Sequence, residues 1–265
     1  MTDINSYLTK LSKQISNSKE EKDEIDTSIL YLKGKIWERF QERLQSVEVF
    51  GSYERGTELK QSVDKKSDVD ILVIFRSKEY QPETFLKHLS EFADNLYKRS
   101  DVAPDFPAIT IELEHIRFEL VPAYWETYII DEDELKIPAP RNKELKWIPT
   151  EAIRLKNDLL EKEKTEKGMM IPMIKLIKYF NTLQGRPYDS YIIEKFALSR
   201  SYPCKNLRDY FFEIINDMVI SGQTDEQKKF VSQLKAIREN LMWFEKRSMN
   251  DHIELELQKF LPLIC

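Results

Sequence analysis

Two carboxylates, Asp68 and Asp70, stand two residues apart at the start of the apolar segment 69–75. The β-branched and aliphatic residues of this segment predict a strand, and strand side chains alternate between two faces. Both carboxylates should therefore project from one face and converge. Because two anions this close repel, a hard divalent cation with oxygen ligands, magnesium or manganese, accounts for the pair. A solvated strand start would have the same spacing, so the spacing alone leaves both interpretations open.

The segment GSYERGT, residues 51–57, precedes the carboxylates and follows a predicted strand over 46–50. Gly51 permits close backbone approach to a phosphate, and we expect a helix to start toward the end of the segment. Backbone N–H groups at such a turn, with the Ser52 and Thr57 hydroxyls, form a natural seat for the β and γ phosphates of a nucleotide. The ordered set of strand, turn, strand-leading SDVD and a later acid-bearing strand indicates a nucleotide site.

A mixed sheet with helical support is expected to position these residues. Two further strands are predicted at 108–113 and 116–121, joined by a short turn in which His115 is exposed. In the segment 19–45, apolar residues recur at three- and four-residue steps on one face. The helices predicted in this half are 4–15, 19–45 and 82–98.

Beyond about Pro140 the sequence is predicted to be almost wholly helical. We therefore expect an α+β chain of two lobes, with a catalytic lobe at 1–140 that includes N-terminal spine helices and a helical lobe at 141–265. The helices predicted in the second lobe are 149–163, 172–184, 189–198, 205–221, 224–246 and 250–262.

Composition limits the partners. Acidic side chains outnumber basic ones by 46 to 41, which gives a net charge of −5. A protein that holds long duplex nucleic acid usually has a strongly basic domain, so composition disfavours such a partner. Cys204 and Cys265 are too few for a disulfide framework and match no metal-ligand spacing, which fits a reducing cytoplasm. The sequence contains no run of about eighteen apolar residues, so we expect a cytoplasmic protein that does not enter a membrane.

The stretch VFGSYERGT followed by SDVDILVIF resembles the nucleotidyltransferase superfamily of DNA polymerase β, poly(A) polymerases, CCA-adding enzymes and oligoadenylate synthases. A helical N-terminal spine that leads into FGSYERGT is similar to the bacterial cGAS/DncV-like nucleotidyltransferases (CD-NTases) of anti-phage signalling. This resemblance covers most of the chain. It implies a polymerase-β-like catalytic lobe and a helical C-terminal lobe that closes the nucleotide cleft.

The resemblance also implies roles for particular residues. Glu119, in the stretch FELVPAY, matches the third family carboxylate, which is usually an aspartate. With Asp68 and Asp70 it would hold two magnesium or manganese ions. Lys178 would contact the triphosphate with help from Ser190. Lys175, on the same helix face, is the alternative to Lys178 for this triphosphate contact.

By resemblance the chain makes a cyclic di- or oligonucleotide second messenger from nucleoside triphosphates, and a separate effector responds to the product. Two alternatives remain open: a template-independent RNA 3′-end nucleotidyltransferase, and a catalytically weak nucleotide-binding regulatory or antitoxin-like protein. The tyrosines Tyr53, Tyr188 and Tyr191 are candidates for base stacking, and core packing explains each of them equally well.

Overall fold

The computed structural model describes residues 3–98, 102–105, 107–128, 132–139, 146–219 and 224–264. Its contacts form two compact units. The sheet unit comprises Ser18–Gln61 and Lys65–Lys156, and the helical unit comprises Met1–Asn17, Ser62–Asp64 and Asn157–Cys265. The division into functional lobes at residue 140 stays a prediction, and the contacts divide the chain elsewhere: the first helix belongs to the helical unit, and the sheet unit extends to Lys156.

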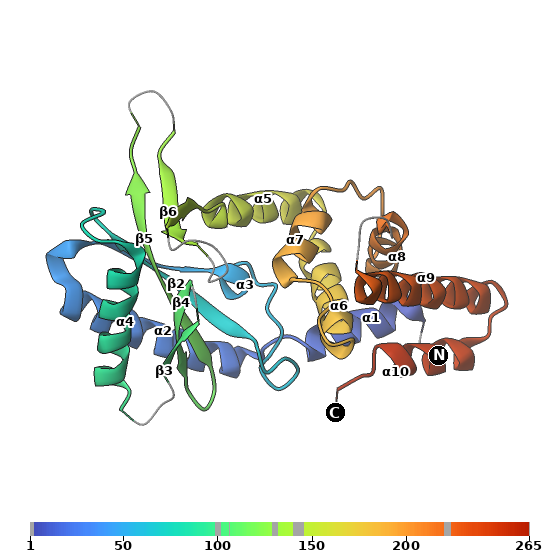
Figure 1. The fold of residues 1–265 in the computed structure, drawn as a ribbon. Coiled ribbons are helices and arrows are strands. Elements are labelled where there is room, and N and C mark those ends of the chain that lie inside the picture. Colours follow the sequence, from blue (N-terminus) through green and yellow to red (C-terminus); the bar gives the residue numbers. More distant parts are fainter. Residues whose placement is uncertain are drawn as a thin grey trace. The chain divides into compact units, whose positions relative to one another are not determined.

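A seven-stranded mixed sheet forms the sheet unit among the described residues (Figure 1). Its main path has the order β1-β2-β5-β4-β3, and β6 joins β5 and β7. The β2–β5 pair is parallel and every other described pair is antiparallel. The strands are β1 (Leu44–Phe50), β2 (Asp68–Phe75), β3 (Val102–Asp105), β4 (Ala108–Glu112), β5 (Arg117–Glu126), β6 (Glu134–Pro138) and β7 (Trp147–Pro149).

Two helices, α2 (Lys19–Phe40) and α4 (Pro82–Leu96), share the main core of the sheet unit. α2 begins with a capping box in which Ser18 and Glu21 each accept the other's backbone N–H. It ends five residues before the predicted 45, because Gln41 has a φ of 44° and a 3-10 turn (Gln41–Arg43) leads directly into β1. Leu44 is buried as the first residue of that strand.

The two faces of β2 have different surroundings. Its odd-numbered residues from Val69 to Phe75 pack in the main core with α2 and α4. Leu72 and Ile74 belong to a smaller cluster with Val121 of β5. Because the aspartates share the even-numbered face with this smaller cluster, they lie on the side of the sheet opposite α2 and α4.

The helical unit is built around α6 (Met170–Leu183), in which every residue from Met173 to Asn181 is buried. α1 (Ile4–Gln14) packs against α6 and α8 (Leu207–Asp217). The Tyr7 hydroxyl of α1 donates to the Leu261 carbonyl (2.9 Å), which joins distant parts of the chain. The remaining helices are α5 (Ala152–Thr165), which starts in the sheet unit, α7 (Ser190–Leu198), α9 (Asp225–Lys246) and α10 (Asn250–Phe260) (Figure 1).

Three short strands, β3, β6 and β7, are absent from the sequence-based prediction. β7 is three residues long and β6 ends at Pro138, so neither shows a usable period-two pattern. The expectation of almost wholly helical structure beyond Pro140 is therefore wrong at Trp147–Pro149, which pairs with β6 in the sheet. Within the described parts of the chain, the helices are too short or too polar to cross a membrane.

Candidate active site

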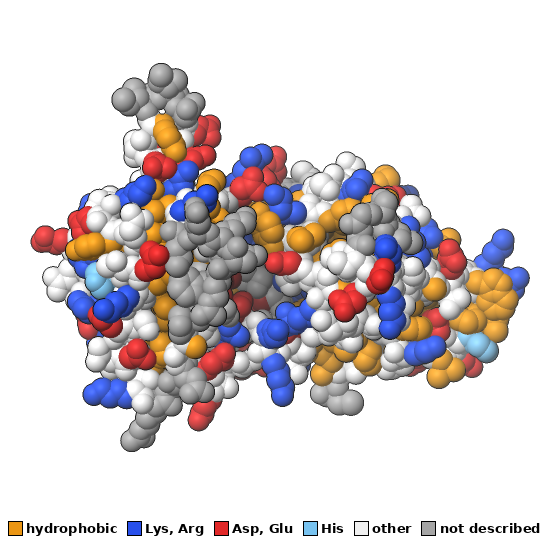
Figure 2. All heavy atoms as spheres, in the orientation of Figure 1, with side chains coloured by type: hydrophobic (Ala, Val, Ile, Leu, Met, Phe, Trp, Pro, Cys, Tyr) orange, Lys and Arg blue, Asp and Glu red, His pale blue; other side chains and the backbone are white. Residues whose placement is uncertain are grey.

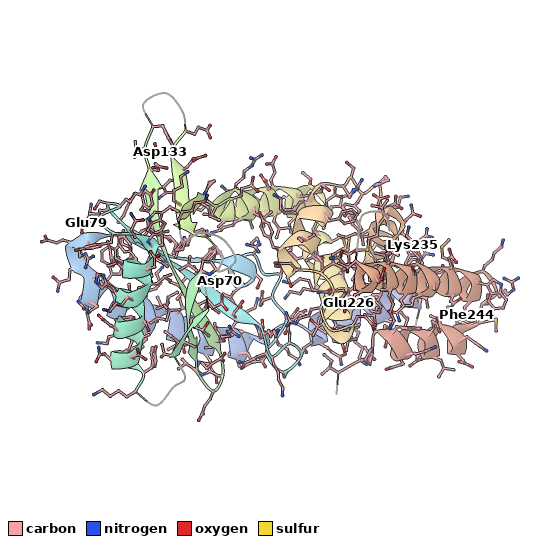
Figure 3. The ribbon with its side chains drawn as sticks, in the orientation of Figure 1. Asp70, Glu79, Asp133, Glu226, Lys235 and Phe244 are labelled. Atoms are coloured by element: carbon pink, nitrogen blue, oxygen red, sulfur yellow. The ribbon has the colours of Figure 1, made fainter. Side chains whose placement is uncertain are left out.

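The register of β2 and β5 brings three carboxylates together. Asp70 is the register partner of Glu119, and Asp68 is the partner of Arg117. Each carboxylate of Asp68, Asp70 and Glu119 offers an oxygen, and these oxygens all lie within 4.8 Å of one another. All three side chains are half-buried (Figure 3 labels Asp70). This cluster of hard oxygen donors suits a divalent cation, and binding of magnesium or manganese there stays a prediction.

Gly51 lies directly against the cluster. Its φ is +72°, a conformation that side-chain-bearing residues rarely adopt. A Cβ atom built at this position would lie 1.7 Å from Oδ2 of Asp70. Two features therefore require glycine at position 51: the backbone conformation and the close approach of the Asp70 carboxylate.

The turn is organised differently from the prediction. The short helix α3 (Gly51–Glu54) begins at the glycine, so the expected helix start toward the end of the segment is wrong. The Thr57 side chain is fully buried, its N–H donates to the Ser52 carbonyl (2.9 Å), and its hydroxyl contacts the same oxygen at 3.5 Å. Thr57 thus closes the turn from inside, whereas Ser52 is half-buried. Phosphate binding by Gly51, Ser52 and Thr57 stays a prediction.

Arg117 was not among the residues singled out from the sequence. Its Nη2 lies 3.0 Å from Oε1 of Glu119, and its Nε lies 3.4 Å from Oε1 of Glu112. Nη2 also donates to the Thr110 hydroxyl at 3.4 Å. A cation therefore contacts the third carboxylate of the cluster.

The family model of the Second Messenger Oligonucleotide or Dinucleotide Synthetase domain, SMODS, matches residues 1–162. The chain belongs to the SMODS family. It is a nucleotidyltransferase, and the predicted relationship to CD-NTases is confirmed. A comparison with curated proteins finds no match.

Solved structures confirm the fold of this SMODS chain. Vibrio cholerae DncV, a cyclic AMP-GMP synthase, is similar with a TM-score of 0.76 and 10% identity over 96% of each chain. CdnC of Escherichia coli MS115-1, solved with ATP, gives a TM-score of 0.74 and 13% identity over 98% of each chain. The CdnE c-di-GMP synthase of Capnocytophaga granulosa gives 0.67 and 18% identity, covering 90% of this chain and 87% of that one. The predicted α+β, polymerase-β-like fold with a helical C-terminal region is thus confirmed.

Three of the residues expected to contact the triphosphate, Lys175, Lys178 and Ser190, belong to the helical unit of the SMODS chain. Lys178 of α6 forms a buried ion pair with Glu194 of α7, with Nζ 3.1 Å from Oε1. Lys175 is also buried, and its Nζ donates to the Ser16 hydroxyl at 2.9 Å. Ser190 is the half-buried first residue of α7. Triphosphate binding by these three residues stays a prediction.

The aromatic candidates have different environments. The Tyr53 hydroxyl donates to Asp26 of α2 at 2.9 Å, and Tyr188 packs edge-on against Phe230. Tyr191 is 39% exposed, and Nζ of Lys195 lies 5.4 Å from the centroid of its ring. Base stacking by these tyrosines stays a prediction. His115 is exposed in its turn, as expected.

Proposed function

We propose that this SMODS chain joins nucleoside triphosphates into a cyclic di- or oligonucleotide second messenger, with Asp68, Asp70 and Glu119 as its catalytic carboxylates. The observation that carries the proposal is the convergence of these carboxylates within 4.8 Å, beside a glycine turn, in a chain of the SMODS family. The DncV and CdnE structures named above belong to cyclic dinucleotide synthases, which supports the choice of product class.

The proposed reaction is an in-line displacement at phosphorus. A ribose hydroxyl of one nucleotide attacks the α phosphorus of another, the new oxygen–phosphorus bond forms, and the bond to the bridging oxygen of the β phosphate breaks. Pyrophosphate leaves with the electron pair of that bond, and the hydroxyl proton passes to solvent. The same displacement within the linear product then closes a ring. Its free ribose hydroxyl attacks its own α phosphorus, and another pyrophosphate leaves.

Asp68, Asp70 and Glu119 would hold two magnesium or manganese ions. When bound, such ions lower the pKa of the attacking hydroxyl and neutralise charge on the triphosphate. The protein fixes the carboxylates in advance, because adjacent parallel strands hold Asp70 and Glu119 in register and the Gly51 turn packs against Asp70. Gly51, Ser52 and Thr57 on the turn, with Lys175, Lys178 and Ser190 of the helical unit, are the proposed triphosphate partners.

The surface supports small substrates over long nucleic acid. On the face drawn in Figure 2, basic and acidic side chains of the described residues are interspersed and not gathered into one basic area. With a net charge of −5, this pattern does not favour the RNA 3′-end alternative. Asp68 and Asp70 do not favour a catalytically weak regulator, because two mutually repelling carboxylates are costly without a role.

Purified protein incubated with four labelled ribonucleoside triphosphates and magnesium or manganese tests the proposal. We expect a small product that survives phosphatase treatment, because a cyclic product has no terminal phosphate. The product should be absent from the Asp68→Ala, Asp70→Ala variant and present with Asp94→Asn, which removes an exposed carboxylate of α4. A wild-type preparation that binds and extends tRNA instead would support the RNA alternative.

The proposed biological role is anti-phage signalling in the bacterial cytoplasm, in which a separate effector responds to the product. Cells that carry the gene and its effector should resist infection, and the Asp70→Asn variant should abolish resistance without changing protein level. Equal resistance with both forms would contradict a role for the product.

A further inference from the structure

The face of the sheet opposite α2 and α4, which bears the three carboxylates, also carries other polar residues in two register rows of three. Across β2, β5 and β4, the first register row is Asp68, Arg117 and Glu112, and the second row is Asp70, Glu119 and Thr110. Residues directly opposite one another on neighbouring strands project from the same face and have adjacent Cβ atoms. Arg117 is therefore flanked by an acid on each neighbouring strand and by Glu119 on its own strand.

The described contacts place the Arg117 charge against Glu119, one of the three carboxylates. Its guanidinium lies 3.0 Å from Glu119, 3.4 Å from Glu112 and 3.4 Å from the Thr110 hydroxyl. The side chains of Arg117 and Glu119 are only 18% and 21% exposed, and Thr110 is buried. Partial burial reduces solvent screening, so this charge acts more strongly on Glu119 than a surface arginine would.

From this arrangement we infer that Arg117 is a resident counter-cation that competes with divalent metal for the Glu119 carboxylate. This inference rests on the proposed metal site. Without metal, one positive charge offsets part of the repulsion among three carboxylates. A metal ion must then bind beside a fixed positive charge, which weakens binding of the free ion. An ion that arrives with a triphosphate brings additional negative oxygens, so productive loading is favoured with the nucleotide.

The competition also gives a physical reason for glutamate at position 119. Arg117 and Glu119 are two residues apart on one strand, and their contact is made by the end of each side chain. The extra methylene of glutamate lengthens the reach of its carboxylate, which contacts Arg117 while one of its oxygens lies within 4.8 Å of the aspartate oxygens. An aspartate at this position would shorten that reach by one carbon.

Binding of Mn²⁺ to the full chain without nucleotide, measured by electron paramagnetic resonance of the free ion, tests the inference independently of turnover. Arg117→Gln should bind Mn²⁺ at least about threefold more tightly than wild type, because a repelling charge is removed. If Arg117→Gln does not fold, Arg117→Met replaces it, since it keeps the apolar length of the side chain. Arg117→Lys should stay within about twofold of wild type, because the charge is retained.

The matched control is Lys136→Gln. Lys136 is more buried than Arg117 and also bridges two acids of the sheet unit, Glu126 (3.3 Å) and Glu134 (2.5 Å), at the other end of β5. Its replacement should leave Mn²⁺ affinity unchanged. Unchanged or weaker affinity in the neutral Arg117 variant overturns the inference, as does a lysine variant that binds as tightly as the neutral one.

Failure of the inference and failure of the proposed function give different results. If Asp70→Asn binds Mn²⁺ as tightly as wild type, the proposed metal site is wrong and the inference falls with it. If Asp70→Asn binds more weakly while the neutral Arg117 variant matches wild type, the metal site stands and only the role of Arg117 is wrong.

Discussion

Replacing Gly51 by alanine would place a methyl group 1.7 Å from Oδ2 of Asp70 in a left-handed backbone conformation. We expect this variant to lose about 2 kcal/mol or more of unfolding free energy and most of its turnover, because Asp70 must move. Gly34→Ala is the matched control: it lies in α2, its Cβ would meet no atom within 4 Å, and it should gain about 0.5–1 kcal/mol.

Urea unfolding and the initial rate of pyrophosphate release measure both glycine variants. A Gly51→Ala protein as stable and active as wild type would show that the turn does not need to lie against the carboxylate.

Glu119→Gln preserves the size of the side chain and removes its negative charge. We expect turnover to fall by about a hundredfold or more, because the transferred phosphoryl group loses the charge stabilisation that depends on this carboxylate. Glu112→Gln is the control, since Glu112 also contacts Arg117 but lies outside the three-carboxylate cluster. Its turnover should change less than about threefold. Equal losses in the two variants, measured as steady-state rates, would argue that Glu119 has no special role.

For individual residues, the sequence predicted part of the three-carboxylate cluster. Strand periodicity placed Asp68 and Asp70 on one face, and only resemblance pointed to Glu119, because strand pairing decides which later acid lies beside them. Arg117 was missed because an arginine two residues before a glutamate looks like an ordinary polar strand face. Its position depends on the register of β2 and β4, which no local pattern in the sequence encodes.

The ion pair between α6 and α7 permits a test at the level of elements. Lys178 and Glu194 are 5% and 1% exposed, so removing one partner leaves a buried charge. Glu194→Leu should cost about 3 kcal/mol or more, whereas Lys178→Met with Glu194→Leu should be within about 1 kcal/mol of wild type. The control Lys228→Met breaks an exposed pair with Asp225 and should have no measurable effect on thermal unfolding.

The double variant also separates structure from substrate binding. If Lys178 contacts the triphosphate, the folded double variant should show a raised KM for nucleoside triphosphates. A wild-type KM in this variant would assign Lys178 a structural role and leave Lys175 as the remaining candidate among the two lysines.

Elements with strong local signals were predicted closely. α9 was expected at 224–246 and spans Asp225–Lys246, because its capping box and apolar periodicity are both local. β7 was missed because it is defined by its pairing with β6. The end of α2 was misplaced because it depends on a single residue with positive φ, Gln41. Tertiary pairing, in these cases, overrides local propensity.

For the whole molecule, composition and family agree. The match to the SMODS family shows a nucleotidyltransferase, and the net charge of −5 is consistent with the proposal that its substrates are small nucleotides. The helix at 4–15 was predicted, yet its packing with the C-terminal helices was not, because contacts between the two ends of a chain leave no local signature.

The most direct test of the central claim is pyrophosphate release per nucleotide incorporated, measured with purified wild type, Asp70→Asn and Asp94→Asn in magnesium and nucleoside triphosphates. Ring closure by the proposed displacement predicts one pyrophosphate for every nucleotide in the product. The catalytic role of Asp70 predicts a rate below about 1% of wild type for Asp70→Asn and a near-wild-type rate for Asp94→Asn. Full pyrophosphate release by Asp70→Asn would contradict catalysis by the three-carboxylate cluster.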